Sequence, residues 1–189
     1  MITALIDARR GLAGVLLLLA GRRDFHDYFD VSSSGMIRSF IAAAIALPLS
    51  AFSAGVANAV AVSAEGGEPP YAFTFVVARW LVAWVYFPPL AALLTRVIGR
   101  NEAFAPWVVL NNWTHLLIVI LQALAFALVL AGATPVGAAL LDGSILLILY
   151  AYVMAARGAL GADWTMSIFT GILNAAFMLG LLRALQMLF

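Results

Sequence analysis

This chain of 189 residues contains five long apolar segments, each close to the length that a membrane-spanning helix needs. A helix crosses the ~30 Å hydrocarbon core of a bilayer with about 20 apolar residues. Short polar or glycine-containing stretches separate the segments, which run over residues 39–62, 71–94, 107–130, 135–156 and 165–187. The pattern predicts an all-α integral membrane protein, in which residues 39–189 form a five-helix transmembrane bundle.

The composition points to the same environment. Hydrophobic residues make up 65% of the chain and charged residues only 10%, whereas soluble domains are about half apolar and a quarter charged. The lack of cysteine excludes disulfides, cysteine-ligated zinc and iron–sulfur clusters. A net charge of +1 gives no reason to expect nucleic acid as a partner, and the lipid bilayer is the expected surrounding.

Arginine, which supplies all ten basic residues, is unevenly distributed among the connections between the spans. The loops after the first and third spans contain none, and the other connections hold Arg9, Arg10, Arg22, Arg23, Arg38, Arg96, Arg100 and Arg157. The positive-inside rule therefore predicts a cytoplasmic N-terminus and a C-terminus outside. Because a lysine-free chain is typical of GC-rich bacterial genomes, we expect the bacterial inner membrane, with the C-terminus in the periplasm.

Residues 1–38 are expected to form an interfacial amphipathic segment on the cytoplasmic side. The apolar run over 11–20 covers only about half of the hydrocarbon core. Arg22 and Arg23 follow it where a signal peptide would have small residues, so we expect no cleavage. Aromatic side chains follow that are expected to anchor at headgroup level, namely Phe25, Tyr28 and Phe29.

The first span carries small or polar residues at every fourth position: Ala42, Ala46, Ser50, Ala54 and Asn58. Such a stripe lets another helix approach closely, and van der Waals packing then stabilises the contact. The stripe predicts packing against a helix of the same chain, of a second copy or of another membrane protein. The alternative is an alanine-rich segment without a dedicated partner.

Two opposite charges lie at similar depth in the outer half of the bundle. Arg79 lies about 12 Å and Asp142 about 10 Å below the outer interface. Because an unpaired charge in hydrocarbon is costly, we predict an ion pair between them. Such a pair would either set the helix register or line a transport path. Alternatively, Arg79 snorkels outward and Asp142 binds Ser144 or water.

A second polar layer is expected in the inner half of the bundle, and consists of Asn111, Asn112, His115, Gln122 and Asn174. Asn111 and His115 are one helical turn apart. We expect these side chains to face protein and to form hydrogen bonds between helices. A gate or proton path that includes His115 is the alternative.

The sequence contains no convincing metal, cofactor or catalytic constellation. The acidic residues and the histidine between Asp24 and Asp30 surround their segment instead of converging on one point. His115 has only asparagine and threonine nearby in sequence, and a metal site needs several convergent ligands. No common catalytic or nucleotide-binding motif occurs either. We therefore expect no catalytic residue, cofactor or metal.

The passage that joins the last two spans resembles the Yip-domain family of small five-span membrane proteins. In bacterial members, an aromatic-rich stretch, a basic residue and a small linker precede the last span, and the matching residues are Tyr150, Tyr152, Arg157, Gly158, Gly161 and Trp164. The resemblance covers the chain from about Arg38 onward and implies an inner-membrane protein. The Asp-Leu-Tyr-Gly-Pro signature of the eukaryotic trafficking members is missing here, so a trafficking role does not carry over.

Taken together, the sequence predicts a non-enzymatic inner-membrane protein that packs against itself or against partner membrane proteins. A small transporter or channel component, with the two polar layers lining a path, is the alternative. The two hypotheses differ in whether the polar layers meet water.

Overall fold

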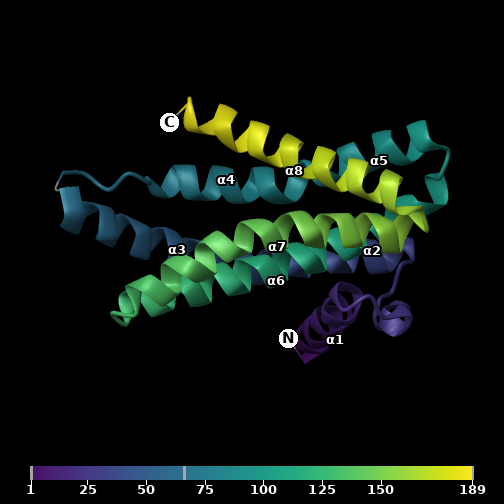
Figure 1. Ribbon diagram of the computed structural model, residues 1–189, viewed down its shortest axis with the longest axis horizontal. Helices are drawn as coiled ribbons and strands as arrows, with labels where there is room; N and C mark the ends of the chain where they lie inside the picture. Colours follow the sequence, from purple (N-terminus) through teal and green to yellow (C-terminus); the bar gives the residue numbers. More distant parts are fainter. Residues whose placement is uncertain (1, 66, 189) are drawn as a thin grey trace.

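The computed structural model describes residues 2–65 and 67–188, and this part of the chain contains helices and no strand (Figure 1). Two short 3-10 helices are present, η1 (Arg23–Tyr28) and η2 (Asn101–Ala103). The α-helices are α1 (Ile2–Leu19), α2 (Ser33–Ser39), α3 (Ile41–Glu65), α4 (Phe73–Val85), α5 (Phe87–Ile98), α6 (Phe104–Leu130), α7 (Thr134–Leu160) and α8 (Trp164–Gln186).

Five helical stretches of the described chain are long and apolar enough to cross a membrane. They are Ser33–Ala64, Phe73–Ile98, Asn101–Leu130, Thr134–Leu160 and Trp164–Gln186. Each contains most of one predicted span. The predictions of an all-helical chain and of five helices long and apolar enough to span a membrane are confirmed for the described residues.

The second of these stretches is not one continuous helix, as the sequence pattern had predicted, but breaks at Tyr86 between α4 and α5. Pro88 and Pro89 explain the break, because proline has no N–H group to donate and its ring clashes with the carbonyl one turn earlier. Both prolines lie in the first turn of α5, where these N–H groups have no helical acceptor. The break leaves Tyr86 at the junction with its side chain buried.

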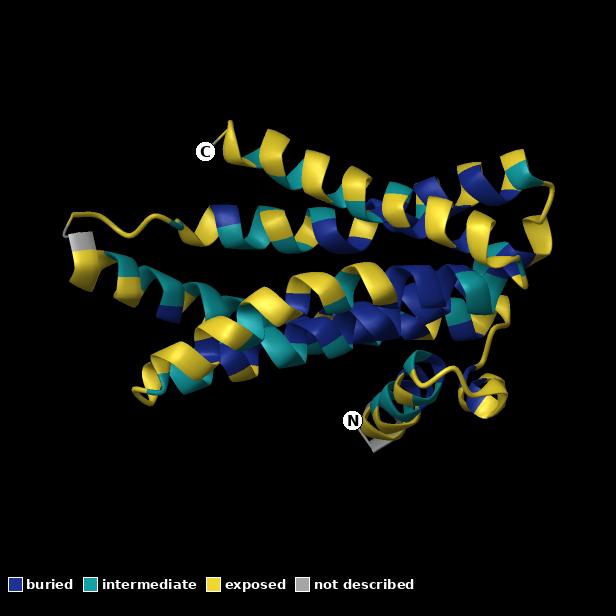
Figure 2. Ribbon diagram, in the orientation of Figure 1, coloured by how far each residue is buried: buried dark blue, intermediate teal, exposed yellow. Residues whose placement is uncertain are grey.

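Helix α6 forms the centre of the bundle. It packs against α7, α3, α1, α2 and α5, and Trp107, Val108 and Leu116 on it are fully buried. Burial is strongest in the half of the bundle that contains the start of α6 and the end of α7 (Figure 2).

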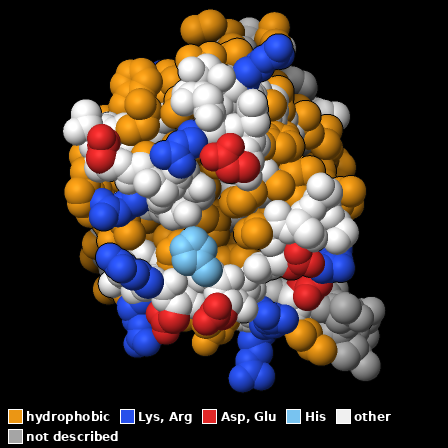
Figure 3. All heavy atoms as spheres, turned by 90° about the vertical axis from the view of Figure 1, so that its right-hand side faces the viewer, with side chains coloured by type: hydrophobic (Ala, Val, Ile, Leu, Met, Phe, Trp, Pro, Cys, Tyr) orange, Lys and Arg blue, Asp and Glu red, His pale blue; other side chains and the backbone are white. Residues whose placement is uncertain are grey.

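The half with the strongest burial ends at a surface that we call the arginine-rich end. Figure 3 looks onto this end and shows basic and acidic side chains gathered on it. The end of α5, the end of α7 and helix α2 meet here (Figure 1). They carry Arg96, Arg157 and Arg38. We call the other side of the bundle, where α3 ends and α7 begins, the opposite end.

The N-terminal segment lies against the bundle, and part of the prediction for it was wrong. Helix α1 packs on α6 and α7, with Val15 and Leu18 buried. Phe25 and Phe29 are also buried, at 7% and 9% exposure, instead of anchoring at headgroup level. Tyr28 is more exposed, at 37%. The glycines of α1 and α7 allow this packing, because a Cβ on Gly14 would lie 2.6 Å from the Phe29 ring.

Helices α7 and α8 approach closely at Gly171. A Cβ on this residue would lie 2.6 Å from Cγ2 and 2.7 Å from Cα of Val153. Backbone atoms cannot move aside as a flexible side chain can, so only glycine fits. This contact holds α8 on the buried half of α7.

We expect Gly171→Ala to destabilise the bundle by about 1–3 kcal/mol, because the added methyl group overpacks the contact with Val153. Gly180→Ala, on the same helix, is the matched control, since a Cβ there has nothing within 4 Å. Thermal unfolding in mild detergent measures the difference. Equal midpoints for the two variants would contradict the close approach of α7 and α8.

Candidate functional site

A chain of buried hydrogen bonds joins three parts of the bundle. The Tyr86 hydroxyl donates to Oδ1 of Asn174 at 2.7 Å, and Nδ2 of Asn174 donates to Oδ1 of Asn111 at 3.1 Å. The exposure of the three side chains is 7%, 0% and 3%. The bonds therefore connect the α4–α5 junction, α8 and α6 in the buried interior.

A second buried bond ties α6 to α2. Nδ2 of Asn112 donates to Oγ of Ser39 at 2.8 Å, and that hydroxyl donates to the Met36 carbonyl at 2.7 Å. Asn112 and Ser39 are both buried. The two consecutive asparagines of α6 thus form hydrogen bonds with different neighbouring helices, because successive residues on a helix point about 100° apart.

His115 lies between aromatic side chains of two other helices. Its Nδ1 is 3.4 Å from the Tyr152 hydroxyl of α7, and its ring meets the Trp84 ring of α4 edge to face, with centroids 4.9 Å apart. The side chain is 9% exposed. Within residues 2–65 and 67–188, no group of three His, Asp or Glu side chains is placed to hold a metal ion.

The structure brings four of the five predicted inner polar residues into these contacts and adds partners that the sequence analysis missed. Gln122 is half-buried and takes no part in the side-chain bonds described for this region. The missed partners are Ser39, Tyr86, Trp84 and Tyr152. Tyrosine and tryptophan count as apolar in a hydropathy pattern, so their polar groups gave no signal.

The ion pair predicted between Arg79 and Asp142 is not formed. In the described part of the chain, the ion pairs are Arg22–Asp24, Arg38–Asp30 and Arg100–Glu102. The reason is helix order: α4 packs mainly on α3 and α8, whereas α7 packs mainly on α6 and α8. Equal depth did not make the two helices neighbours. Asp142 is exposed on α7, and the Ser144 hydroxyl donates to the Leu141 carbonyl.

Arg79 lies instead in a groove between α4 and α8, near the opposite end. The groove is lined by Phe75, Arg79, Leu179, Leu182, Arg183 and Gln186. Both arginines are exposed. The lining therefore combines apolar walls with two positive charges and no carboxylate.

The small-residue stripe of α3 divides into two halves. Ala42 and Ala46 are fully buried in the core, whereas Ser50 and Ala54 are half-buried. Asn58 at the far end bonds Tyr71, with its Nδ2 donating to the carbonyl at 2.9 Å and its Oδ1 accepting from the N–H at 3.0 Å. This pair of bonds closes the connection between α3 and α4.

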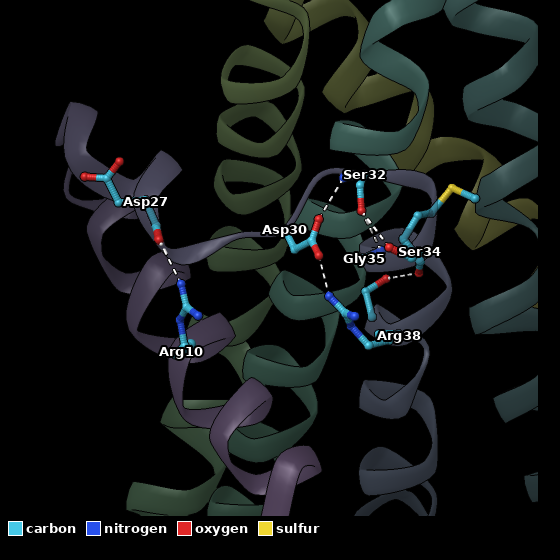
Figure 4. Close-up of polar contacts among 9 residues, drawn as sticks. Arg10, Asp27, Asp30, Ser32, Ser34, Gly35 and Arg38 are labelled. Atoms are coloured by element: carbon cyan, nitrogen blue, oxygen red, sulfur yellow. Dashed lines mark hydrogen bonds and ion pairs between the residues drawn. The ribbon is translucent and has the colours of Figure 1, made fainter.

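Polar contacts hold the N-terminal segment at the arginine-rich end (Figure 4). Asp30 forms an ion pair with Arg38 and accepts a hydrogen bond from the Ser32 N–H at 3.0 Å. The Ser32 hydrogen bonds and the nearby Arg38 hold the pKa of the Asp30 carboxyl below its usual value. Arg10 of α1 donates to the Asp27 carbonyl at 3.1 Å. The contacts of Asp30 attach the segment before α2 to the start of the first span, and the Arg10 bond attaches η1 to α1.

The residues that carry the Yip-domain resemblance lie where α7 meets α8 and α1. The Arg157 guanidinium lies 3.7 Å from the centroid of the Trp164 ring, a cation–π contact. Gly161 ends α7 in the left-handed conformation, with φ +56°, which favours glycine. The Tyr150 hydroxyl donates to the Leu19 carbonyl at 2.6 Å. Each of these contacts connects two helices.

No protein-family model, curated protein or solved structure matches this chain. The resemblance to the Yip-domain family therefore stays an expectation from the sequence. What the chain does has to be argued from its own geometry.

We expect Tyr86→Phe to lower the stability of the bundle by about 0.5–1.5 kcal/mol, because it leaves the Asn174 carbonyl oxygen without its donor in a dry interior. Tyr71→Phe is the control, since the Tyr71 hydroxyl makes none of the hydrogen bonds seen among the described residues. Unfolding in detergent measures both variants. A Tyr86→Phe protein as stable as the wild type would show that the Tyr86 bond does not hold the α4–α5 junction in place.

Proposed function

We propose that this chain is a non-enzymatic protein of the bacterial inner membrane that acts by packing its helices against a second copy or against partner membrane proteins. One observation carries the proposal. Asn111, Asn112 and Asn174 in the interior are hydrogen-bonded to other helices. In contrast, Arg79, Asp142 and Arg183 are exposed on the spanning helices and form no ion pair in the described part of the chain. These three charges are therefore available to a partner on the outside of the bundle.

The inner polar layer favours a structural role over a transport path. A path needs polar groups that exchange contacts with water or substrate. Asn111, Asn174 and His115 are at most 9% exposed, and each contacts a polar side chain of another helix. These contacts account for the asparagines and the histidine as links between helices.

The surroundings of His115 also argue against an enzyme. General acid–base catalysis needs a titratable group within reach of a substrate in a cleft. The contacts described for His115 are with the Trp84 ring and the Tyr152 hydroxyl, both inside the bundle. A Yip-like assembly role requires no such cleft, and the contacts around Arg157 are consistent with it.

The orientation belongs to the same proposal, with the arginine-rich end in the cytoplasm. Alkaline phosphatase fused to the C-terminus is then active, because this enzyme folds only in the periplasm. The same enzyme fused after Arg100, at the arginine-rich end, is inactive and serves as the control. The reverse pair of activities would contradict the proposed orientation.

We expect the chain, extracted in its native lipids, to retain at least one membrane-protein neighbour, either a second copy or another protein. Ala54→Leu enlarges the half-buried part of the α3 stripe and should reduce recovery of a neighbour bound there. Ala59→Leu, at an exposed position of the same helix, is the matched control. Native mass spectrometry of lipid discs gives the readout. A wild-type chain that is monomeric and has no neighbour would contradict the proposed function.

A further inference from the structure

Away from the arginine-rich end, three charged side chains lie within the candidate membrane-spanning helices without an ion pair in the described chain: Arg79, Asp142 and Arg183. Arg79 lies about 9 Å from the start of α4, and Asp142 about 12 Å from the start of α7. Both helices start at the opposite end, so the two charges lie at a similar depth. A charge in hydrocarbon is costly unless it meets a partner or water.

The two arginines share the groove between α4 and α8. Arg79 enters it from α4 and Arg183 from α8, and Phe75 and Leu179 provide apolar walls. None of the lining residues is acidic. A groove with this charge and these walls fits a carboxylate carried on an apolar helix.

Helix α7 presents such a carboxylate. Asp142 is exposed, and so are Ala138, Ala139 and Gly143 around it. A Cβ on Gly143 would meet nothing within 4 Å, so this face is uncovered. Leu146, one turn further along, is 74% exposed. Small residues around a polar side chain allow the close approach that helix association in lipid requires.

We propose that the chain associates with a second copy of itself in the membrane, head to tail, with Asp142 of one copy in the arginine groove of the next. The inference rests on the proposed packing function and names the partner and the surfaces. Within one chain α4 and α7 are not packed together, so the groove and the carboxylate belong to separate surfaces. A contact of this kind is heterologous and forms closed rings or open chains.

A second copy accounts for the observations better than a lipid does. A lipid phosphate would lie at headgroup level and could neutralise the arginines, but it would leave Asp142 unpaired. A second copy supplies one carboxylate at the depth of Arg79, which gives Asp142 a partner and neutralises one of the two positive charges of the groove. Charge complementarity thus selects the chain itself as the partner.

The lack of cysteine allows a clean cross-linking test in the full-length chain. One version carries Ala139→Cys beside Asp142, and another carries Leu179→Cys in the groove. We expect a disulfide-linked dimer when the two versions are co-expressed in one membrane, and none when either is expressed alone. A control pair replaces Leu179→Cys by Ile172→Cys, which is exposed on α8 about 10 Å nearer the arginine-rich end.

The charge dependence separates this contact from random collision. Asp142→Asn, added to the Ala139→Cys version, should lower the cross-linked fraction by roughly threefold or more, and Asp142→Glu should retain it. Because the Asp142 side chain is exposed, we expect both variants to keep the fold, and circular dichroism in detergent checks their helical content.

Three outcomes would overturn the proposal. Equal cross-linking of the Ala139→Cys versions with and without Asp142→Asn would show that the charge is not part of the contact. Cross-linking of either single version alone would show a symmetric interface instead of a head-to-tail one. The two versions can also be mixed in vesicles of phosphatidylethanolamine, alone or with added phosphatidylglycerol. No cross-link in either kind of vesicle would show that lipid or solvent occupies the groove. In each case, a neighbour retained in native lipid discs would still support the proposed function.

Discussion

The structure depends on the burial of polar side chains on α6. A helix at the centre of a bundle meets other helices on every side, and an unsatisfied amide there costs free energy in the absence of water. Asn111 bonds α8, Asn112 bonds α2, and His115 contacts α7 and α4. These three polar side chains of α6 thus determine which neighbours are held against it. Van der Waals packing alone is less selective, because lipid tails solvate an apolar helix equally well.

The break at Tyr86 lets the second span take part in this arrangement. Proline in the first turn of α5 interrupts the helix, and the residue at the interruption points its hydroxyl at Asn174. In an unbroken helix, the Tyr86 side chain would have the direction that the regular helix geometry gives it. The local chemistry of two prolines is therefore connected with the packing of α8, which is far away in sequence.

The two halves of the bundle differ in how tightly they are packed and in the charges that they expose. Toward the arginine-rich end, burial is strongest (Figure 2), and the buried asparagines Asn111 and Asn112 are hydrogen-bonded to other helices. Toward the opposite end, α7 exposes Asp142 among small residues, and α4 and α8 expose two arginines. A bundle that is tightly packed in one half and exposes charges without an ion pair in the other is suited to association within the membrane. This contrast connects the proposed packing function with the proposed self-association.

The sequence by itself determined the helices and the environment, because span length and hydropathy are local properties of the chain. It also indicated that residues such as Asn111 and Asn174 face protein, since lipid offers them no partner. Only the tertiary structure decided which helices are neighbours. Depth is one coordinate of a residue in a bundle, and the order of helices around the bundle is another, so Arg79 and Asp142 share a level without meeting. Phe25 and Phe29 were misplaced for the same reason, because aromatic rings suit an interface or a core, and only packing against α1 chose between them.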